Sequence, residues 1–183
     1  MEEPAEVSDR QFLTFHLAGE EYAIEIFRVR EIIEYGVVTH VPLTPPWIRG
    51  VINLRGGVVP VLDLALRFGL PVAEVTPRTC IVVVETEFGG VETPMGIVAD
   101  SVSQVMELRT QDIEPPPPFG ARIRLEFLLG MARTEKKFAL LLDIDRILSS
   151  DELLTLAEAT QADQEAAGAA APESQPDSPQ ALA

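Results

Sequence analysis

Two stretches of this chain repeat one spaced pattern, and this repeat constrains the fold more than any other feature. Gly50-Val51 and Gly130-Met131 are each followed, at the same offset, by a dense apolar strand. Each strand closes on an aspartate, Asp63 in the first copy and Asp143 in the second. Repetition at a long period indicates one small β unit that is used twice.

A second pair of segments agrees with this duplication. Tyr22-Ala23-Ile24 and Met95-Gly96-Ile97 lead, at the same steps, to apolar positions around Glu31 in one copy and Gln104 in the other. Many short strands with Gly and Pro turns and very little helix predict two small antiparallel barrels. Each unit is marginal in size for independent stability. We therefore expect a mainly β domain of two subdomains that share a core.

The repeat and the composition also set the expected boundaries. Residues after 160 are rich in Ala, Gln, Pro, Glu and Ser without periodicity, which predicts disorder. This tail is either a solubilising extension or an arm for one partner. The expected parts are a disordered lead (1–10), a folded domain (11–159) with subdomain patterns at about 11–70 and 79–148 and a C-terminal helix (151–159), and a disordered acidic tail (160–183).

Several local elements follow from turn and cap chemistry. Residues 29–34 form either a short helix or a bent strand, which periodicity does not decide. Thr44–Ile48 is predicted to be a helical turn with Thr44 as its N-cap. Arg55-Gly56-Gly57 is expected to join two strands of a hairpin. Asp63 and Asp143 are each expected to cap a short helix.

The charge of the chain limits the kinds of partner that it can bind. The net charge is −15, but residues 11–150 hold 18 acids and 13 bases and contribute only −5 of it. No basic face is available to neutralise phosphates, so we expect no nucleic-acid binding. The acidic start lacks the bases of a targeting sequence, and the apolar runs are too short to span a bilayer. We expect a cytoplasmic protein with no direct membrane insertion.

Residues for catalysis or metal binding are scarce. Cys80, the single cysteine, lies in a β-branched run and is expected to be an inert core residue. His16 and His40 have no partner at metal-ligand spacing. The glycines after Arg55 lack the Lys-Ser/Thr of a phosphate loop. We expect no enzyme activity, no metal and no cofactor.

Two charged residues embedded among apolar ones remain. Glu31 lies within Val29-Arg30-Glu31-Ile32-Ile33, and Arg55 lies within Asn53-Leu54-Arg55-Gly56-Gly57. They are either solvated turn residues or an arginine–carboxylate pair that braces two strands next to a groove. Trp47, the only tryptophan, is either a core residue or a binding hot spot.

These segments resemble a known family, the CheW-type coupling proteins of bacterial chemotaxis. The resemblance covers roughly residues 10–157 in the right order. Its most specific motif is Asn-Leu-Arg-Gly (53–56) ahead of the Val-Pro-Val-x-Asp-Leu strand (59–64). The other matching segments are Glu20–Ile24, Val29–Ile32, Thr44–Asn53, Gly96–Val102 and Pro115–Phe119.

The resemblance implies a fold of two SH3-like five-stranded β-barrels that share a hydrophobic core. It implies a non-catalytic adaptor that joins the cytoplasmic tip of a methyl-accepting chemoreceptor to the regulatory domain of a CheA-type histidine kinase. Such adaptors also help to assemble receptor arrays at the membrane. It also implies that Glu31 and Arg55 pair, whereas the kinase-binding residues are not mapped beyond the barrel ends. The positions that match the receptor-contact groove, with two apolar neighbours, are Val29, Glu31, Ile33, Gly50, Val51 and Arg55.

Two alternatives stay open. The same scaffold serves chemotaxis-like kinase pathways that control surface motility, development or gene expression, and the sequence does not separate these pathways. A remote alternative is a small-molecule-binding barrel with polar groups that converge on an apolar cleft. We expect no phosphorylatable receiver domain, because no segment of that length follows residue 160.

Overall fold

The computed structural model describes residues 9–116, 125–135 and 137–148, together with residues 151, 152, 154, 155 and 158. The predicted tail and all but the last two residues of the predicted lead lie outside this described part. The five described residues after 150 have helical backbone. No helix in the described part is long and apolar enough to cross a membrane.

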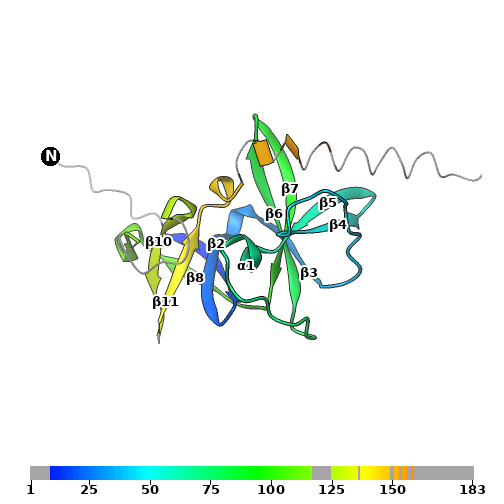
Figure 1. The fold of residues 1–183 in the computed structure, drawn as a ribbon. Coiled ribbons are helices and arrows are strands. Elements are labelled where there is room, and N and C mark those ends of the chain that lie inside the picture. The colour runs from blue at the N-terminus through cyan, green and yellow to red at the C-terminus, as the bar shows by residue number, and fades with distance from the viewer. Residues whose placement is uncertain are drawn as a thin grey trace, which may run out of the picture.

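Short strands joined by tight turns make up most of the described chain (Figure 1). The strands are β1 (Arg10–Leu17), β2 (Glu20–Glu25), β3 (Val29–Glu34), β4 (Ile48–Leu54), β5 (Gly57–Leu62), β6 (Cys80–Phe88), β7 (Val91–Ala99), β8 (Ser101–Leu108), β9 (Ile113–Glu114), β10 (Leu128–Arg133) and β11 (Phe138–Leu142). The helical turns are η1 (Ile26–Arg28), α1 (Leu64–Arg67), η2 (Thr110–Asp112), η3 (Leu125–Phe127) and η4 (Ile144–Arg146).

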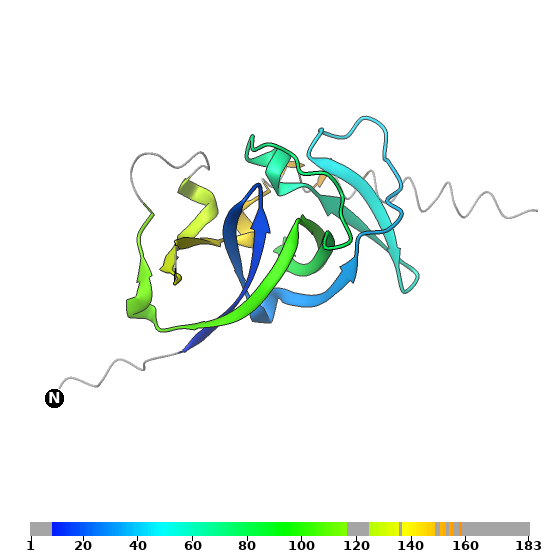
Figure 2. The ribbon, with the colours of Figure 1, turned by 90° about the horizontal axis from the view of Figure 1, so that it is seen from below.

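These strands form two sheets, which confirms the predicted mainly β fold of two barrels. The first barrel has the strand order β8-β1-β2-β11-β10-β9, and the second has the order β3-β6-β7-β5-β4. Figure 2 shows β10 and β11 at one end of the molecule and β4 and β5 at the other, with β1 and β2 between them. The first sheet has six strands rather than five because the two-residue β9 is counted with it.

Each barrel takes strands from both copies of the repeat. β3 of the first copy pairs with β6 of the second, and β8 of the second copy pairs with β1 of the first. Two parallel contacts, β2 with β11 and β5 with β7, join the copies again. The ranges 11–70 and 79–148 therefore describe the sequence repeat and do not divide the two sheets. This exchange depends on long-range pairing, which local patterns do not encode.

The shared core lies where the two barrels meet. Its central cluster takes buried side chains from both sheets, and smaller clusters fill the interior of each barrel. A row of aromatic rings runs through the central cluster, with centroid separations between 5.8 and 6.2 Å, from Phe15 through Tyr22 and Phe68 to Phe127. Neither barrel buries this face alone, so the burial of this apolar surface holds the two barrels together.

Caps and strands follow the local predictions. Val29–Glu34 is a strand, which settles the choice between helix and strand. The Asp63 carboxylate accepts a hydrogen bond from the Leu66 N–H at 3.1 Å and so caps α1. In the second copy, the Asp143 carboxylate accepts one from the Asp145 N–H at 3.2 Å and caps η4. The caps recur because in each copy a buried strand is followed directly by a short helical turn, whose first N–H groups need an acceptor.

The helical turn predicted after Thr44 is wrong. The segment forms a hydrogen-bonded turn in which the Ile48 N–H donates to the Pro45 carbonyl at 2.9 Å, and β4 begins there. The Thr44 hydroxyl donates back to the Val41 carbonyl at 2.8 Å, so it does not cap a helix. Proline at the second position of a β-turn satisfies the same pattern as proline at the start of a helix.

Candidate functional site

Glu31 and Arg55 form a two-pronged ion pair, as the family resemblance implied. The Arg55 guanidinium donates from Nη1 to Glu31 Oε1 at 2.5 Å and from Nη2 to Oε2 at 3.0 Å. Glu31 comes from β3 and Arg55 from the β4–β5 turn. β3 and β4 are the two edges of the second sheet, so this pair links the edges of the second barrel.

The turn that carries Arg55 is short and left-handed. Leu54 pairs with Gly57, which leaves Arg55 and Gly56 as a two-residue loop with φ of +51° and +81°. Positive φ at both central residues defines a type I′ turn, where Asn and Gly are the preferred residues. The Asn53 carboxamide oxygen accepts the Gly56 N–H at 3.0 Å and supports the turn. Arginine at the first loop position is costly, and its side chain is used to reach Glu31.

The pair presents Arg55 to solvent while it fixes the position of the guanidinium. The Arg55 side chain is 77% exposed and that of Glu31 is 21% exposed. An exposed pair contributes only about 0.2–1 kcal/mol to stability. Three of the five guanidinium N–H groups remain free of Glu31, because a two-pronged pair uses two. The arrangement is therefore suited to binding a partner's carboxylate or carbonyl groups at low ordering cost.

The apolar neighbours of Glu31 fall on two faces of β3. A bulge between Val29 and Glu31 shifts the register. Val29 and Ile32 lie opposite residues of the shared core, whereas Ile33 packs into the interior of the second barrel. Ile32 is 45% exposed and lies on the face of β3 opposite to Glu31. Sequence reasoning named Ile33, which shares the face of Glu31 because side chains alternate along a strand.

Gly50 and Val51 lie beneath another segment. Thr39 crosses β4 at this point, and its N–H and carbonyl exchange hydrogen bonds with Val51 at 2.9 and 2.8 Å. A Cβ on Gly50 would stand 2.0 Å from the Thr39 carbonyl oxygen. Both site residues are buried. They are placed to hold the Thr39 segment and do not present a surface of their own.

The second copy contains the same close approach. A Cβ on Gly130 would stand 2.7 Å from the Glu114 carbonyl oxygen of β9. Met131, which follows this glycine, pairs with Glu114 as Val51 pairs with Thr39. Glycine is thus required in both barrels for one strand to cross another closely. This requirement accounts for Gly50 through the fold alone.

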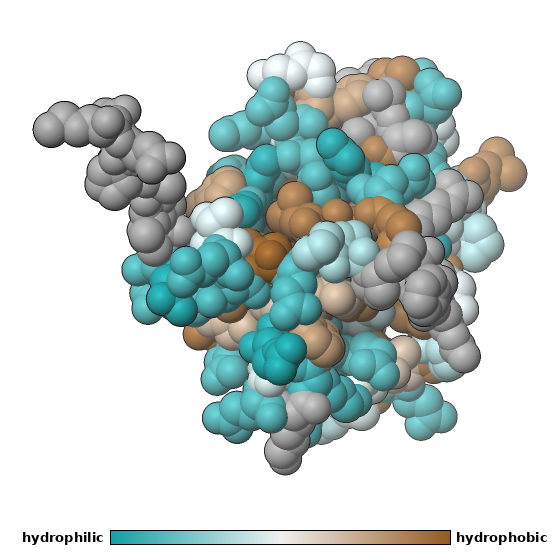
Figure 3. Space-filling view, turned by 90° about the vertical axis from the view of Figure 1, so that its left-hand side faces the viewer, coloured by the Kyte–Doolittle hydropathy of each residue, from teal (hydrophilic) through white to brown (hydrophobic). Residues whose placement is uncertain are grey.

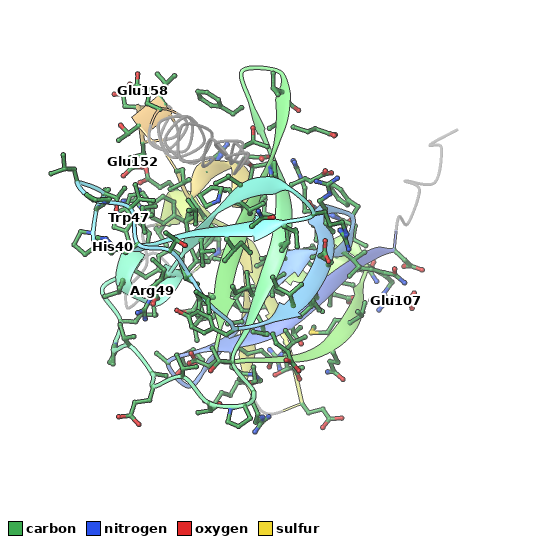
Figure 4. The ribbon with its side chains drawn as sticks, turned by 90° about the vertical axis from the view of Figure 1, so that its right-hand side faces the viewer. His40, Trp47, Arg49, Glu107, Glu152 and Glu158 are labelled. Atoms are coloured by element: carbon green, nitrogen blue, oxygen red, sulfur yellow. The ribbon has the colours of Figure 1, made fainter. Side chains whose placement is uncertain are left out.

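Trp47 belongs to a cluster that joins the barrels to the C-terminal segment. The Arg67 guanidinium lies over the Trp47 ring at 4.7 Å and over the Phe127 ring at 5.6 Å. It also donates to the Ile147 carbonyl and forms a two-pronged pair with Glu152 at 2.9 Å. Figure 4 shows Trp47 and Glu152 on the same flank of the molecule, opposite to Glu107. The contacts of this half-buried tryptophan therefore serve the fold: they join the barrels to the C-terminal segment.

The surroundings of Cys80 and Asp63 indicate structural rather than catalytic roles. Burial raises the pKa of the Cys80 thiol, which lowers its reactivity at neutral pH. Asp63 is buried and paired with Arg49 at 2.7 Å in addition to its cap contact. Among the described residues, no group of three or more His, Cys, Asp and Glu side chains is arranged to hold a metal ion.

A hollow of about 470 Å³ lies between β1, η1 and β8, away from the Glu31–Arg55 pair. Within it, the Arg10 Nε donates to Glu25 at 2.8 Å, so two of its charged groups satisfy each other. The hollow is lined by Asp9, Arg10, Gln11, Glu25, Ile26, Phe27 and Glu107. Five of these seven residues are charged or polar, whereas small-molecule sites are mostly apolar, which gives little support to a small-molecule site.

Apolar side chains also reach the surface at the end of the first barrel. Figure 3 shows this face, where a small apolar group lies within a mostly hydrophilic surface. The exposed apolar residues of η3, β10 and β11 are Leu125, Leu129 and Phe138. Exposed apolar groups rimmed by polar residues are typical of protein–protein contacts.

Comparison with known proteins identifies related chains. The CheW-like domain matches residues 11–152. The chemotaxis protein CheW of Klebsiella aerogenes is 38% identical over 148 residues, which cover 81% of this chain and 87% of that protein. The protein FrzA of Myxococcus xanthus is 33% identical over 125 residues, which cover 68% of this chain and 75% of that protein.

A solved structure agrees with the fold. The crystal structure of the scaffolding protein TtCheW from Thermoanaerobacter tengcongensis superposes with a TM-score of 0.72. Its sequence is 31% identical, and the match covers 84% of this chain and 98% of that one. The two-barrel architecture described above is thus that of a known scaffold.

Proposed function

This chain belongs to the CheW-like domain family and is an adaptor of a chemotaxis or chemotaxis-like pathway, and from that premise we propose that it couples chemoreceptors to a histidine kinase. The proposed partners are the cytoplasmic tip of a methyl-accepting chemoreceptor and the regulatory domain of a CheA-type kinase. We further propose that the protein is cytoplasmic, is recruited to receptor arrays at the membrane and has no catalytic activity.

The observation that carries the receptor contact is the Glu31–Arg55 pair. It holds an exposed guanidinium at the edge of the second barrel, with donors that Glu31 does not use. A receptor tip is a helical hairpin, and one helix face can lie against such a barrel edge. Val29 supports this surface from the shared core.

Within this proposal, Gly50 and Val51 are positioning residues. They hold the Thr39 segment against β4 and so fix the position of the strand that leads to Arg55. Ile33 likewise anchors β3 from inside the barrel. The contact surface itself then centres on Glu31 and Arg55.

The kinase contact is proposed at the barrel ends. The apolar group at the end of the first barrel supports this assignment, because a homologous barrel on the kinase can bury it. Neither contact needs to be strong, since an array combines weak contacts through avidity. A chemotaxis-like pathway uses the same contacts with other receptors, and the match to FrzA keeps that alternative in view.

The test is a titration of this protein against a receptor tip fragment and, separately, against the kinase regulatory domain. We expect saturable binding to both. Arg55→Ala is expected to weaken only receptor binding, by about tenfold, because it removes an exposed charged contact without opening the core. Wild-type affinity of Arg55→Ala for the receptor tip would show that the receptor contact lies elsewhere.

A further inference from the structure

The β6–β7 hairpin is longer than its counterpart in the other copy of the repeat. β2 reaches its turn two residues before Tyr22, whereas β7 begins four residues before Met95, the matching position. The added part lies beyond the last pair that β6 forms with β3, at Val84 and Val29. Figures 1 and 4 show it projecting from the body of the protein. We call residues 85–94 the ribbon.

The ribbon is anchored at its base. The Arg30 guanidinium pairs with the Glu85 carboxylate at 3.0 Å, and the Glu87 N–H donates to the Asp145 carboxylate at 3.2 Å. Thr86 is buried, and its hydroxyl donates to the Thr93 carbonyl at 3.1 Å. Contacts from β3 and η4 therefore hold a two-stranded segment that is marginal on its own. A held segment loses less conformational freedom when it binds a partner.

The outer part of the ribbon is poorly suited to a purely structural role. Glu87 and Glu92 lie directly opposite each other, and like charges in this position destabilise a hairpin. Neither carboxylate takes part in an ion pair among the described residues. At the tip, Val91 pairs with Phe88 and is 64% exposed. Because successive strand residues face opposite sides, the two carboxylates lie on one face of the ribbon and Val91 lies on the other. A partner that surrounds the tip, with Lys or Arg on one side and an apolar side chain on the other, would complement all of these features.

The position of the ribbon indicates which partner this is. β6 continues from the ribbon alongside β3, where Glu31 pairs with Val83. From Val83 to Phe88 is five strand residues, or about 17 Å. An α-helix covers that span with about eleven residues, or three turns. One helix of a receptor tip can therefore reach both places.

We propose that the ribbon is a second contact for the receptor tip, engaged together with the Glu31–Arg55 pair. This inference rests on the proposed receptor-coupling function and adds a chain-specific arm to it. Glu87 and Glu92, on the face of β6 that Val83 and Glu31 share, contact basic residues of the receptor helix, which removes the repulsion between the two carboxylates. Val91 contacts an apolar residue of the receptor tip from the other face of the ribbon.

The experiment titrates the full chain against a receptor tip fragment. The ribbon variants are Val91→Ser and the double variant Glu87→Gln/Glu92→Gln. Their matched controls are Val75→Ser, at a valine that is 57% exposed, and Glu74→Gln, both in the connector between α1 and β6. We expect each ribbon variant to bind about fivefold more weakly, and the controls to bind as wild type. Raising the salt concentration should reduce the difference in receptor affinity between the wild type and Glu87→Gln/Glu92→Gln, because salt screens the charges.

Thermal unfolding separates a binding role from a structural one. Because Glu87→Gln/Glu92→Gln removes a like-charge pair, it should keep or raise the melting temperature while it weakens receptor binding. Ribbon variants that bind the receptor tip like their controls overturn the inference and leave the Arg55→Ala result untouched. Loss of kinase binding with intact receptor binding also overturns it. If the wild-type chain does not bind the receptor tip, the proposed function fails, and the ribbon contact fails with it.

Discussion

The hairpins β4–β5 and β10–β11 have the same skeleton and differ at their turns. In each, the aspartate that ends the second strand donates its N–H at 2.8 Å to the residue before the first strand: Asp63 to the Trp47 carbonyl, and Asp143 to the Phe127 carbonyl. Each hairpin also has a glycine where another strand crosses. At the turns, however, Glu135 occupies the position that corresponds to Arg55.

The same difference appears on the strand opposite the turn. Gln104 of β8 corresponds to Glu31 of β3. With Glu135 and Gln104 in place of Arg55 and Glu31, the first barrel cannot form the ion pair of the second. Features that recur in both copies are required to build a barrel, whereas features present in one copy are available for binding. The duplication thus provides an internal control for each site residue.

The largest expected effect is at the recurring glycines. Gly50→Ala should lower the free energy of unfolding by more than about 3 kcal/mol, since the new Cβ meets backbone and Gly50 has a φ of +142°. Gly130→Ala should cost less, about 1–3 kcal/mol, because the closest atom to its Cβ is at 2.7 Å rather than 2.0 Å. Urea unfolding measures both values, provided that the dependence of the unfolding free energy on urea concentration is the same as in the wild type.

The two substitutions also test the positioning role of Gly50. If both proteins fold, Gly50→Ala should weaken receptor binding, because it displaces the Thr39 segment from β4, the strand that leads to Arg55. Gly130→Ala disturbs the other barrel and should leave receptor binding unchanged. A larger loss of stability at Gly130 than at Gly50 would contradict the assignment of Thr39 as the tighter crossing.

The next effect is at the turns and concerns binding rather than stability. Arg55→Asn places Asn-Gly in a type I′ turn, which should leave stability unchanged or raise it by about 0.5 kcal/mol. It also removes the pair with Glu31, so receptor binding should fall about tenfold. The matched variant Glu135→Asn changes the corresponding turn of the first barrel and should not alter receptor binding. Equal binding by both variants and the wild type would remove Arg55 from the contact surface.

Local chemistry made part of this structure predictable. The caps at Asp63 and Asp143 and the hairpin at Arg55 depend on neighbouring residues, so the sequence pattern contains the information they need. The pairing of Glu31 with Arg55 came from the family resemblance, which supplies long-range contacts that composition does not. The structure contains this pair, while its receptor role stays a proposal.

Other features depend on residues that are distant in sequence. The burial of Gly50 requires Thr39 to cross β4, and the exchange of β3 and β8 between copies requires pairing across the whole chain. Thr44 shows the converse, because one local pattern fits two kinds of turn. Such choices are made by tertiary packing.

The smallest expected effect concerns the dependence of stability on pH, in which the two copies of the repeat differ. Tyr22 and Met95 occupy matching positions in the shared core, but only Tyr22 can ionise. Burial, and secondarily the charge of Glu20, raises the pKa of Tyr22 to about 12. A phenol with a raised pKa keeps its proton in the folded state after the unfolded chain has lost it. Its stabilising contribution is therefore complete below about pH 10 and is lost as the pH rises towards 12.

Tyr22→Phe should remove this dependence on pH. Near neutral pH the variant and the wild type should differ by less than about 1 kcal/mol, because the ring and its packing are retained. Between pH 10 and 12 the wild type should lose up to about 1.4 kcal/mol per pH unit relative to the variant. Urea unfolding of both proteins at pH 8, 10 and 11.5 measures the difference, and other titrating groups cancel because both proteins contain them. Parallel stability curves would mean that the Tyr22 hydroxyl reaches solvent in the folded state, so that the shared core is open at this position of the first copy.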